Sequence, residues 1–332
     1  MDPVARSFVV GAVVPGLASC AILLIGGKFF GNRFGGAGIS RRSAAGVLAT
    51  AGAGATGAAA TAPILAVLAS VLIALGGIFG QWALTGGLRL NRTSAFDTVW
   101  MLLGLCAVIA ALAGILSSMR GRRLARASVI VTLLGAAVMS VLAANVAKLD
   151  WLAAGVLAAM SLVAVMALGL AWAQGGQSSS AKRTADGLWP AVFVTLWLLT
   201  AGQCLQLGLA SQRLALVVHC MAGAAGGAAI AAAVWPALRA GWGGALVVVM
   251  GAAICLAQGV SLGGGEMTMG TKLAMTGLLV VSAIVFAAGP QLVRWVRADW
   301  AAGVLRLVLA GIPAVAALAL AVRQFVQTQG EV

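Results

Sequence analysis

The chain has 332 residues, of which 62% are hydrophobic and 8% are charged. A soluble globular domain is about 45–50% apolar and about 25% charged, so this composition excludes a soluble globular protein. The net charge of +14 would suggest nucleic acid in a soluble protein, but here the basic residues stand at the ends of apolar runs without interleaved aromatic residues. We expect them to set the membrane topology and to contact anionic lipid head groups, with no nucleic-acid partner.

The apolar residues fall into repeated runs of about 20, the length at which an α-helix crosses roughly 30 Å of hydrocarbon. No gap between the runs is long enough for a soluble domain. The sequence therefore predicts an all-α, polytopic membrane protein: residues 1–332 form a single integral membrane domain, a bundle of about 10–11 transmembrane helices with short loops. The candidate spans are 8–27, 44–62 (uncertain), 64–84, 97–118, 128–147, 151–173, 188–210, 214–236, 243–260, 273–288 and 301–322.

Residues 43–87 are compatible with one crossing or with two. Residues 44–62 are almost wholly Ala, Gly and Thr, and Pro63 separates them from an ordinary apolar run. With one crossing, the side of the Arg120–Arg126 cluster holds 13 Lys and Arg residues and the other side 7, with Arg306 left inside a span. With two crossings, each side holds 10. Because cytoplasmic loops carry an excess of basic residues, the count favours ten spans.

Four arginines, Arg120, Arg122, Arg123 and Arg126, stand between two long apolar runs. Each would cost about 2.5–3.5 kcal/mol at the centre of a membrane helix, so this segment is expected to be a loop. The positive-inside rule then places the loop in the cytoplasm, and we interpret the membrane as the bacterial cytoplasmic (inner) membrane. Most tryptophans lie near predicted span ends, as interfacial residues do, whereas Trp197 is expected to lie deep.

Chemically reactive side chains are sparse. The five cysteines all lie inside apolar runs and none has a CxxC partner, so neither a disulfide nor a thiolate metal site is expected. His219 is the only histidine, which excludes a site built from several histidines of one chain. We therefore expect no cofactor and no metal ion, and we assign no catalytic residue.

Polar side chains are costly inside a membrane, and several gather on two consecutive predicted helices. Gln203 and Gln206 are three residues apart, Thr200 lies one turn before Gln203, and His219 lies on the helix that returns after a short turn. At 1.5 Å per residue, Gln203 and His219 are expected at similar depth, where they could meet. One interpretation is a polar lining for a solute path. The other is an interhelical hydrogen bond worth about 0.6–2 kcal/mol.

Aspartate and glutamate are found only at span ends or in loops. Coupled carriers usually need an embedded carboxylate or histidine chain, so a proton-driven pump is disfavoured, although carbonyls at helix breaks near Pro290 or Pro313 could bind sodium. Arg306, about one turn into the last span, is expected to extend to the interface or to bind an anion. Gly223 and Gly227 are expected to let helices pack closely, either as a rigid contact or as a gating seam.

Three functions agree with these features. The first is a permease or exporter of a small organic solute by alternating access, with Thr200, Gln203, Gln206 and His219 along the path. The second is a non-transporting membrane scaffold, assembly factor or subunit of a larger complex. The third, an enzyme acting on lipid-linked substrates, is the weakest, because acids, histidines and cysteines do not cluster along the sequence. Besides the lipid bilayer, the expected partner is a small solute.

Overall fold

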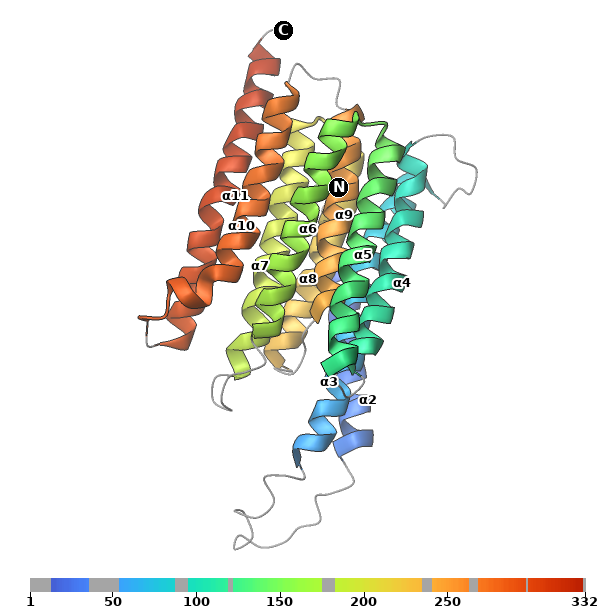
Figure 1. The fold of residues 1–332 in the computed structure, drawn as a ribbon, viewed down its shortest axis with the longest axis vertical. Coiled ribbons are helices and arrows are strands. Elements are labelled where there is room, and N and C mark those ends of the chain that lie inside the picture. Colours follow the sequence, from blue (N-terminus) through green and yellow to red (C-terminus); the bar gives the residue numbers. More distant parts are fainter. Residues whose placement is uncertain are drawn as a thin grey trace, which may run out of the picture.

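The computed structural model describes residues 13–35, 54–86, 95–118, 122–174, 183–234, 241–262, 268–296 and 298–330. In these ranges the chain forms ten α-helices and two short helical segments, arranged as one bundle (Figure 1). Of the described helices, nine are long and apolar enough to cross a membrane, and α2 contributes a shorter apolar stretch, Val14–Gly26. The predicted all-α polytopic membrane bundle is confirmed.

The helices alternate in direction, so successive helices finish at opposite ends of the bundle. The upper end, at the top of Figure 1, is where α3, α5, α9 and α11 finish; the lower end is the opposite one. In chain order the elements are α2 (Val14–Gly35), α3 (Gly54–Thr85), the 3-10 helix η2 (Ala95–Thr98), α4 (Val99–Ser118), α5 (Arg122–Ala147), α6 (Trp151–Gln174), α7 (Arg183–Gln203), the π-helical segment η3 (Cys204–Gly208), α8 (Gln212–Val234), α9 (Gly241–Leu262), α10 (Met269–Leu292) and α11 (Asp299–Gly330).

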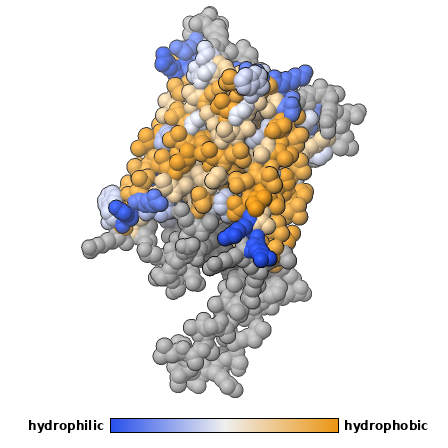
Figure 2. All heavy atoms as spheres, viewed as in Figure 1, coloured by the Kyte–Doolittle hydropathy of each residue, from blue (hydrophilic) through white to orange (hydrophobic). Residues whose placement is uncertain are grey.

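The surface shows why this bundle belongs in a membrane. Figure 2 shows a broad hydrophobic band between the ends and hydrophilic residues at the ends. Exposed tryptophans lie near helix ends, among them Trp151, Trp295 and Trp300, as expected for residues at the membrane interface. Trp197 instead is buried, and its indole N–H donates to the Leu279 carbonyl at 2.8 Å, which confirms its predicted deep position.

Several helices extend beyond the apolar runs from which they were predicted, and two of these extensions change the interpretation of the sequence. Residues 54–62, left open in the sequence as part of a separate span, are the first turns of α3, and this helix continues through Pro63. The rest of that uncertain segment, residues 44–53, lies outside the described residues. The expected arginine loop is also shorter than predicted, because Arg122, Arg123 and Arg126 belong to the first turns of α5. Arg123 and Arg126 are exposed there, so a helix can carry them past the apolar band.

Helix α9 forms the centre of the bundle. It packs against α3, α4, α5, α6 and α8, and 94% of its most apolar stretch is buried, against 22% for α11. Lipid tails are as apolar as the helices, so association depends on close packing and on hydrogen bonds more than on the hydrophobic effect. Most side chains on α9 are therefore separated from both water and lipid.

A seam of small residues joins α8 to α2 and α3. A Cβ added at Gly16 of α2 would lie 2.9 Å from the Gly223 carbonyl oxygen, and one added at Gly227 would meet the Gly16 carbonyl. On the α3 side, a Cβ at Gly76 would lie 2.8 Å from the Cys220 carbonyl oxygen. The predicted close packing at Gly223 and Gly227 is confirmed, because no larger side chain fits where these backbones touch.

Candidate functional site

The residues predicted to line a path lie on the hairpin formed by α7, η3 and α8. In η3 the hydrogen bonds widen by one residue, so that the Leu209 N–H donates to the Cys204 carbonyl at 3.3 Å. Ala210 then adopts a positive φ of 49°, and the chain reverses into α8. Single π-helical turns are frequent at functional sites, because they displace side chains from the regular α-helical positions.

Gln203 and His219 meet across this hairpin. The Gln203 amide nitrogen lies 3.5 Å from His219 Nε2, a long contact for a hydrogen bond, and both side chains are half-buried. The imidazole lies against Gly202, where a Cβ would overlap the ring, and it also interacts with the backbone of Leu199. A neutral imidazole has one donor and one acceptor, so it can serve the amide on one side and a carbonyl on the other.

The other two predicted residues form no hydrogen bond with this pair within the described part of the chain. The Thr200 hydroxyl donates to the Leu196 carbonyl of its own helix at 2.9 Å. Gln206 lies within η3, where a π-helical turn holds more residues than an α-helical turn. On an α-helix, the three-residue spacing would place Gln206 on the same face as Gln203. The wider turn of η3 moves Gln206 away from that face.

The polar pair is near the upper end of the bundle instead of at its middle. Gln203 lies five residues before the end of η3, and His219 lies seven residues after the start of α8. At 1.5 Å per residue, both are within about 11 Å of the upper end. A path through these residues would therefore begin at the upper end, the end with fewer basic residues.

Sequence reasoning missed Gln258, the most isolated polar side chain of the described residues. It lies on α9, four residues before the end of that helix, with 0% of its surface exposed. Within the described part of the chain, neither its amide oxygen nor its amide nitrogen has a hydrogen-bond partner. Each unpaired buried polar atom costs about 1–3 kcal/mol, and in native proteins such an atom commonly marks a missing water, ion or functional contact.

A second buried glutamine lies at the same end. Gln81, near the end of α3, is 2% exposed, and its amide nitrogen donates to the Phe96 carbonyl in η2 at 2.7 Å. This bond ties the upper end of α3 to the segment that precedes α4. The Gln81 amide oxygen has no partner among the described residues. The sequence signal for both glutamines was only an isolated amide near the end of an apolar run.

Lys272 of α10 completes the polar layer at the upper end. It is buried, and its ammonium donates to the Val260 carbonyl in the last turn of α9 at 3.1 Å. The last carbonyls of a helix lack intrahelical partners and carry a partial negative charge, so a cation is stabilised there. Lys272 lies inside α10, just before the predicted span 273–288, and this position allows it to cap the end of α9.

Arg306 turns inward, and the prediction that it extends to the interface is wrong. Its Nη2 donates to the Phe286 carbonyl of α10 at 3.2 Å, and its guanidinium carbon lies 4.5 Å from the centre of the Phe286 ring. The reason is Pro290: without an N–H, it leaves the carbonyl four residues earlier, that of Phe286, without its helical donor. Arg306 supplies the missing donor, which gives it a structural role between α10 and α11.

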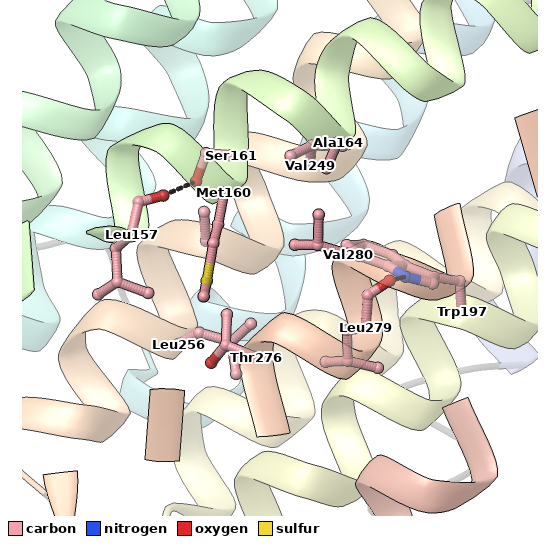
Figure 3. Close-up of a pocket in the computed structure, with 11 residues that line it drawn as sticks. Leu157, Met160, Ser161, Ala164, Trp197, Val249, Leu256, Thr276, Leu279 and Val280 are labelled. Carbon is pink, nitrogen blue, oxygen red and sulfur yellow. Dashed lines mark hydrogen bonds between the residues drawn. The ribbon is translucent and has the colours of Figure 1, made fainter. Parts of the chain in front are cut away.

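Two interior pockets among the described residues are small and mainly apolar. The first, shown in Figure 3, has a cavity of about 20 Å³ between α6, α7, α9 and α10, lined by Leu157, Met160 and Trp197 among others. The second, near Ser140 and Met250, has about 10 Å³. The first has room for about one water, whereas a pocket for an organic ligand usually has about 300–1,000 Å³.

The described residues hold no group of three His, Cys, Asp or Glu side chains placed to bind a metal ion. Comparison of the chain with protein-family models, curated proteins and solved structures finds no match. Gln81, Gln203, Gln258 and His219 supply hydrogen-bonding groups, which can bind and orient a polar molecule.

Proposed function

We propose that this multi-pass membrane protein is a permease for a small organic solute, which enters the bundle at its upper end. The observation that carries the proposal is the concentration of buried or half-buried polar side chains in the upper part of the interior, above all Gln203 with His219 and the unpaired Gln258. Polar groups inside a membrane bundle are rare and commonly mark a solute or ion path.

The proposed path has a polar entrance and an apolar barrier. The entrance lies along the α7–η3–α8 hairpin, with Thr200, Gln203, Gln206 and His219 as the residues expected to line it. Below it, α9 is packed on its neighbours by fully buried side chains such as Leu246 and Met250. This arrangement corresponds to a state closed toward the lower end, and alternating access would require the barrier to open.

The small-residue seam of α8 offers a place for that movement. Gly223 and Gly227 contact the backbone of α2 at Gly16, and neither has a side chain that could interlock with that helix. Such a surface resists sliding less than one with interlocking side chains, because no side chain has to leave a pocket on the facing helix. The helices α2 and α8 can therefore shift relative to each other with limited repacking.

The test is the reaction of single cysteines with a membrane-impermeant thiol reagent, in a variant whose five native cysteines are replaced. Cysteines at the positions of Gln203, Gln206 and His219 are expected to react. A cysteine at Gln212, exposed at the start of α8, is the positive control, and one at Leu134, 61% exposed on the apolar outer face, is the negative control. Silence at all three test positions, with a reacting Gln212 position, would overturn the permease proposal.

A second function, the non-transporting scaffold or complex subunit, is favoured by one observation. The described interior pockets of about 20 Å³ and 10 Å³ are far too small for an organic solute. A bundle that stays closed in this way would serve as a structural partner in the membrane. Silence of the three cysteines would select this function, because it would show that water does not reach the polar layer.

A further inference from the structure

The buried side chains of Gln81 and Gln258, which hold three unpaired amide atoms among the described residues, lie on helix faces that pack against the same two side chains. On α3, a Cβ at Gly77 would lie 2.8 Å from Leu103 Cδ1 and 2.9 Å from Met221 Cγ. On α9, a Cβ at Gly251 would meet the same two residues, at 2.8 Å from Met221 Sδ and 3.2 Å from Leu103 Cδ2. Leu103 and Met221 are therefore held between these two glycine surfaces.

Helical periodicity places each glutamine on the same helix face as the glycine below it. Gln81 follows Gly77 by four residues, about one turn, and Gln258 follows Gly251 by seven, about two turns, so each lies on the same face of its helix as its glycine. The helices α3 and α9 pack directly on each other and both run toward the upper end. Both glutamines thus lie above Met221 and Leu103, at heights that differ by only about 5 Å at 1.5 Å per residue.

Rotation of the amide groups does not remove the unpaired atoms. For Gln258 neither atom has a partner in the described residues, so exchanging its oxygen and nitrogen changes nothing. For Gln81 the exchange would place its amide oxygen against the Phe96 carbonyl, two acceptors facing each other, and would break the 2.7 Å hydrogen bond. Two acceptors and one donor group therefore remain open.

We propose that the space between Gln81 and Gln258 is a binding site for a small neutral hydroxyl or amide group. Such a ligand donates to the two amide oxygens and accepts from the Gln258 amide nitrogen. The partners it meets are neutral amides, which match an uncharged ligand. Met221, a flexible side chain at the floor of the site, can adapt to the ligand. A water molecule and the hydroxyl or amide of a solute share this chemistry, and the site exists whether or not the protein transports that solute.

The first experiment measures the thermal midpoint of the full-length protein in lipid nanodiscs, comparing wild type with Gln258→Leu and Gln258→Met. If the site is occupied, both variants lose the ligand and their midpoint falls by several degrees. If the site is empty, an apolar side chain of similar size removes an unpaired amide, and the midpoint is unchanged or rises. The second result would overturn the proposal.

The second experiment uses the wild-type protein, so it does not depend on the folding of a variant. Radiolysis of a water or hydroxyl held beside Met221 is expected to oxidise this methionine in the wild-type protein several-fold faster than Met139, which is also fully buried. Equal protection of the two methionines would contradict a bound ligand. In Gln258→Leu, the Met221 rate is expected to fall to that of Met139.

Added glycerol, as a hydroxyl probe, or acetamide, as an amide probe, identifies the source of the ligand. A change in the Met221 oxidation rate that is absent in Gln258→Leu assigns the site to a solute, and an unchanged fast rate assigns it to water. The reaction of cysteines at the α7–α8 hairpin tests the permease separately. An occupied Gln258 site with silent hairpin cysteines would refute the permease and retain the site.

Discussion

The contact between Arg306 and the Phe286 carbonyl leads to a prediction that follows directly from the chemistry of proline. Pro290 removes the N–H that would otherwise bond the Phe286 carbonyl, and Arg306 donates to it at 3.2 Å. Arg306 lies seven residues into α11, about 10 Å along the helix, where water is scarce. Arg306→Leu should therefore leave the carbonyl unsatisfied, in addition to losing the contact with the Phe286 ring.

The magnitude is obtained from a double-mutant cycle with Pro290→Ala. A hydrogen bond to a charged group is worth about 1.5–3 kcal/mol, and the cation–π contact adds roughly 1–2 kcal/mol. In the Pro290→Ala background, Ala at position 290 supplies the helical N–H, so Arg306→Leu should no longer leave the Phe286 carbonyl unsatisfied. The ring contact is lost in both backgrounds, so we expect the coupling free energy to equal that of the hydrogen bond, about 1.5–3 kcal/mol.

The assay is reversible unfolding by SDS in mixed micelles, with wild type, both single variants and the double variant measured under the same conditions. The reasoning predicts that Arg306→Leu destabilises the proline-containing protein more than the alanine-containing one. An equal effect in both backgrounds, within about 0.3 kcal/mol, would show that Pro290 and Arg306 do not share the Phe286 carbonyl, and the explanation would be refuted.

Two further substitutions test the packing of the bundle by the same unfolding assay. Gly227→Leu should lower the free energy of unfolding by at least about 2 kcal/mol, because the new side chain would overlap the Gly16 backbone, whereas Gly155→Leu, on an exposed face with nothing within 4 Å, should change it little. A tolerated Gly227→Leu would contradict the close α2–α8 contact. Trp197→Phe should lower it by about 1 kcal/mol through loss of the hydrogen bond to Leu279, and no loss would show that this bond does not stabilise α7 against α10.

Local features of the sequence predicted the fold well, because membrane helices must satisfy their backbone hydrogen bonds within one segment. The approach of Gln203 to His219 was also predictable, since a short turn between antiparallel helices determines which residues share a depth. Their position near the upper end follows from the same counting once the ends of η3 and α8 are known. The π-helical turn that displaces Gln206 has no comparable signal in the sequence.

The isolation of Gln258 could not be predicted from the chain alone. A glutamine near the end of an apolar run usually reaches water at the interface or a hydrogen-bond partner on a neighbouring helix. Gln258 reaches neither: α9 lies at the centre of the bundle, and neither amide atom has a partner among the described residues. That position depends on which non-consecutive helices pack together. Because the helix surfaces are as apolar as the lipid tails, the sequence contains little information about that choice. Arg306 is an intermediate case. Pro290 in the sequence predicts a carbonyl without its helical donor, but only the packing of α11 on α10 identifies Arg306 as the replacement donor.

The account rests on the proposal that water reaches the polar layer from the upper end alone. The most direct measurement is labelling of a single cysteine at the Gln203 position, carried out in parallel in right-side-out and inside-out membrane vesicles with an impermeant thiol reagent. From the excess of basic residues at the lower end we propose that the upper end faces outside, so we expect rapid reaction in right-side-out vesicles and at least tenfold slower reaction in inside-out vesicles. Reaction from the lower side alone, or from neither side, would contradict the account.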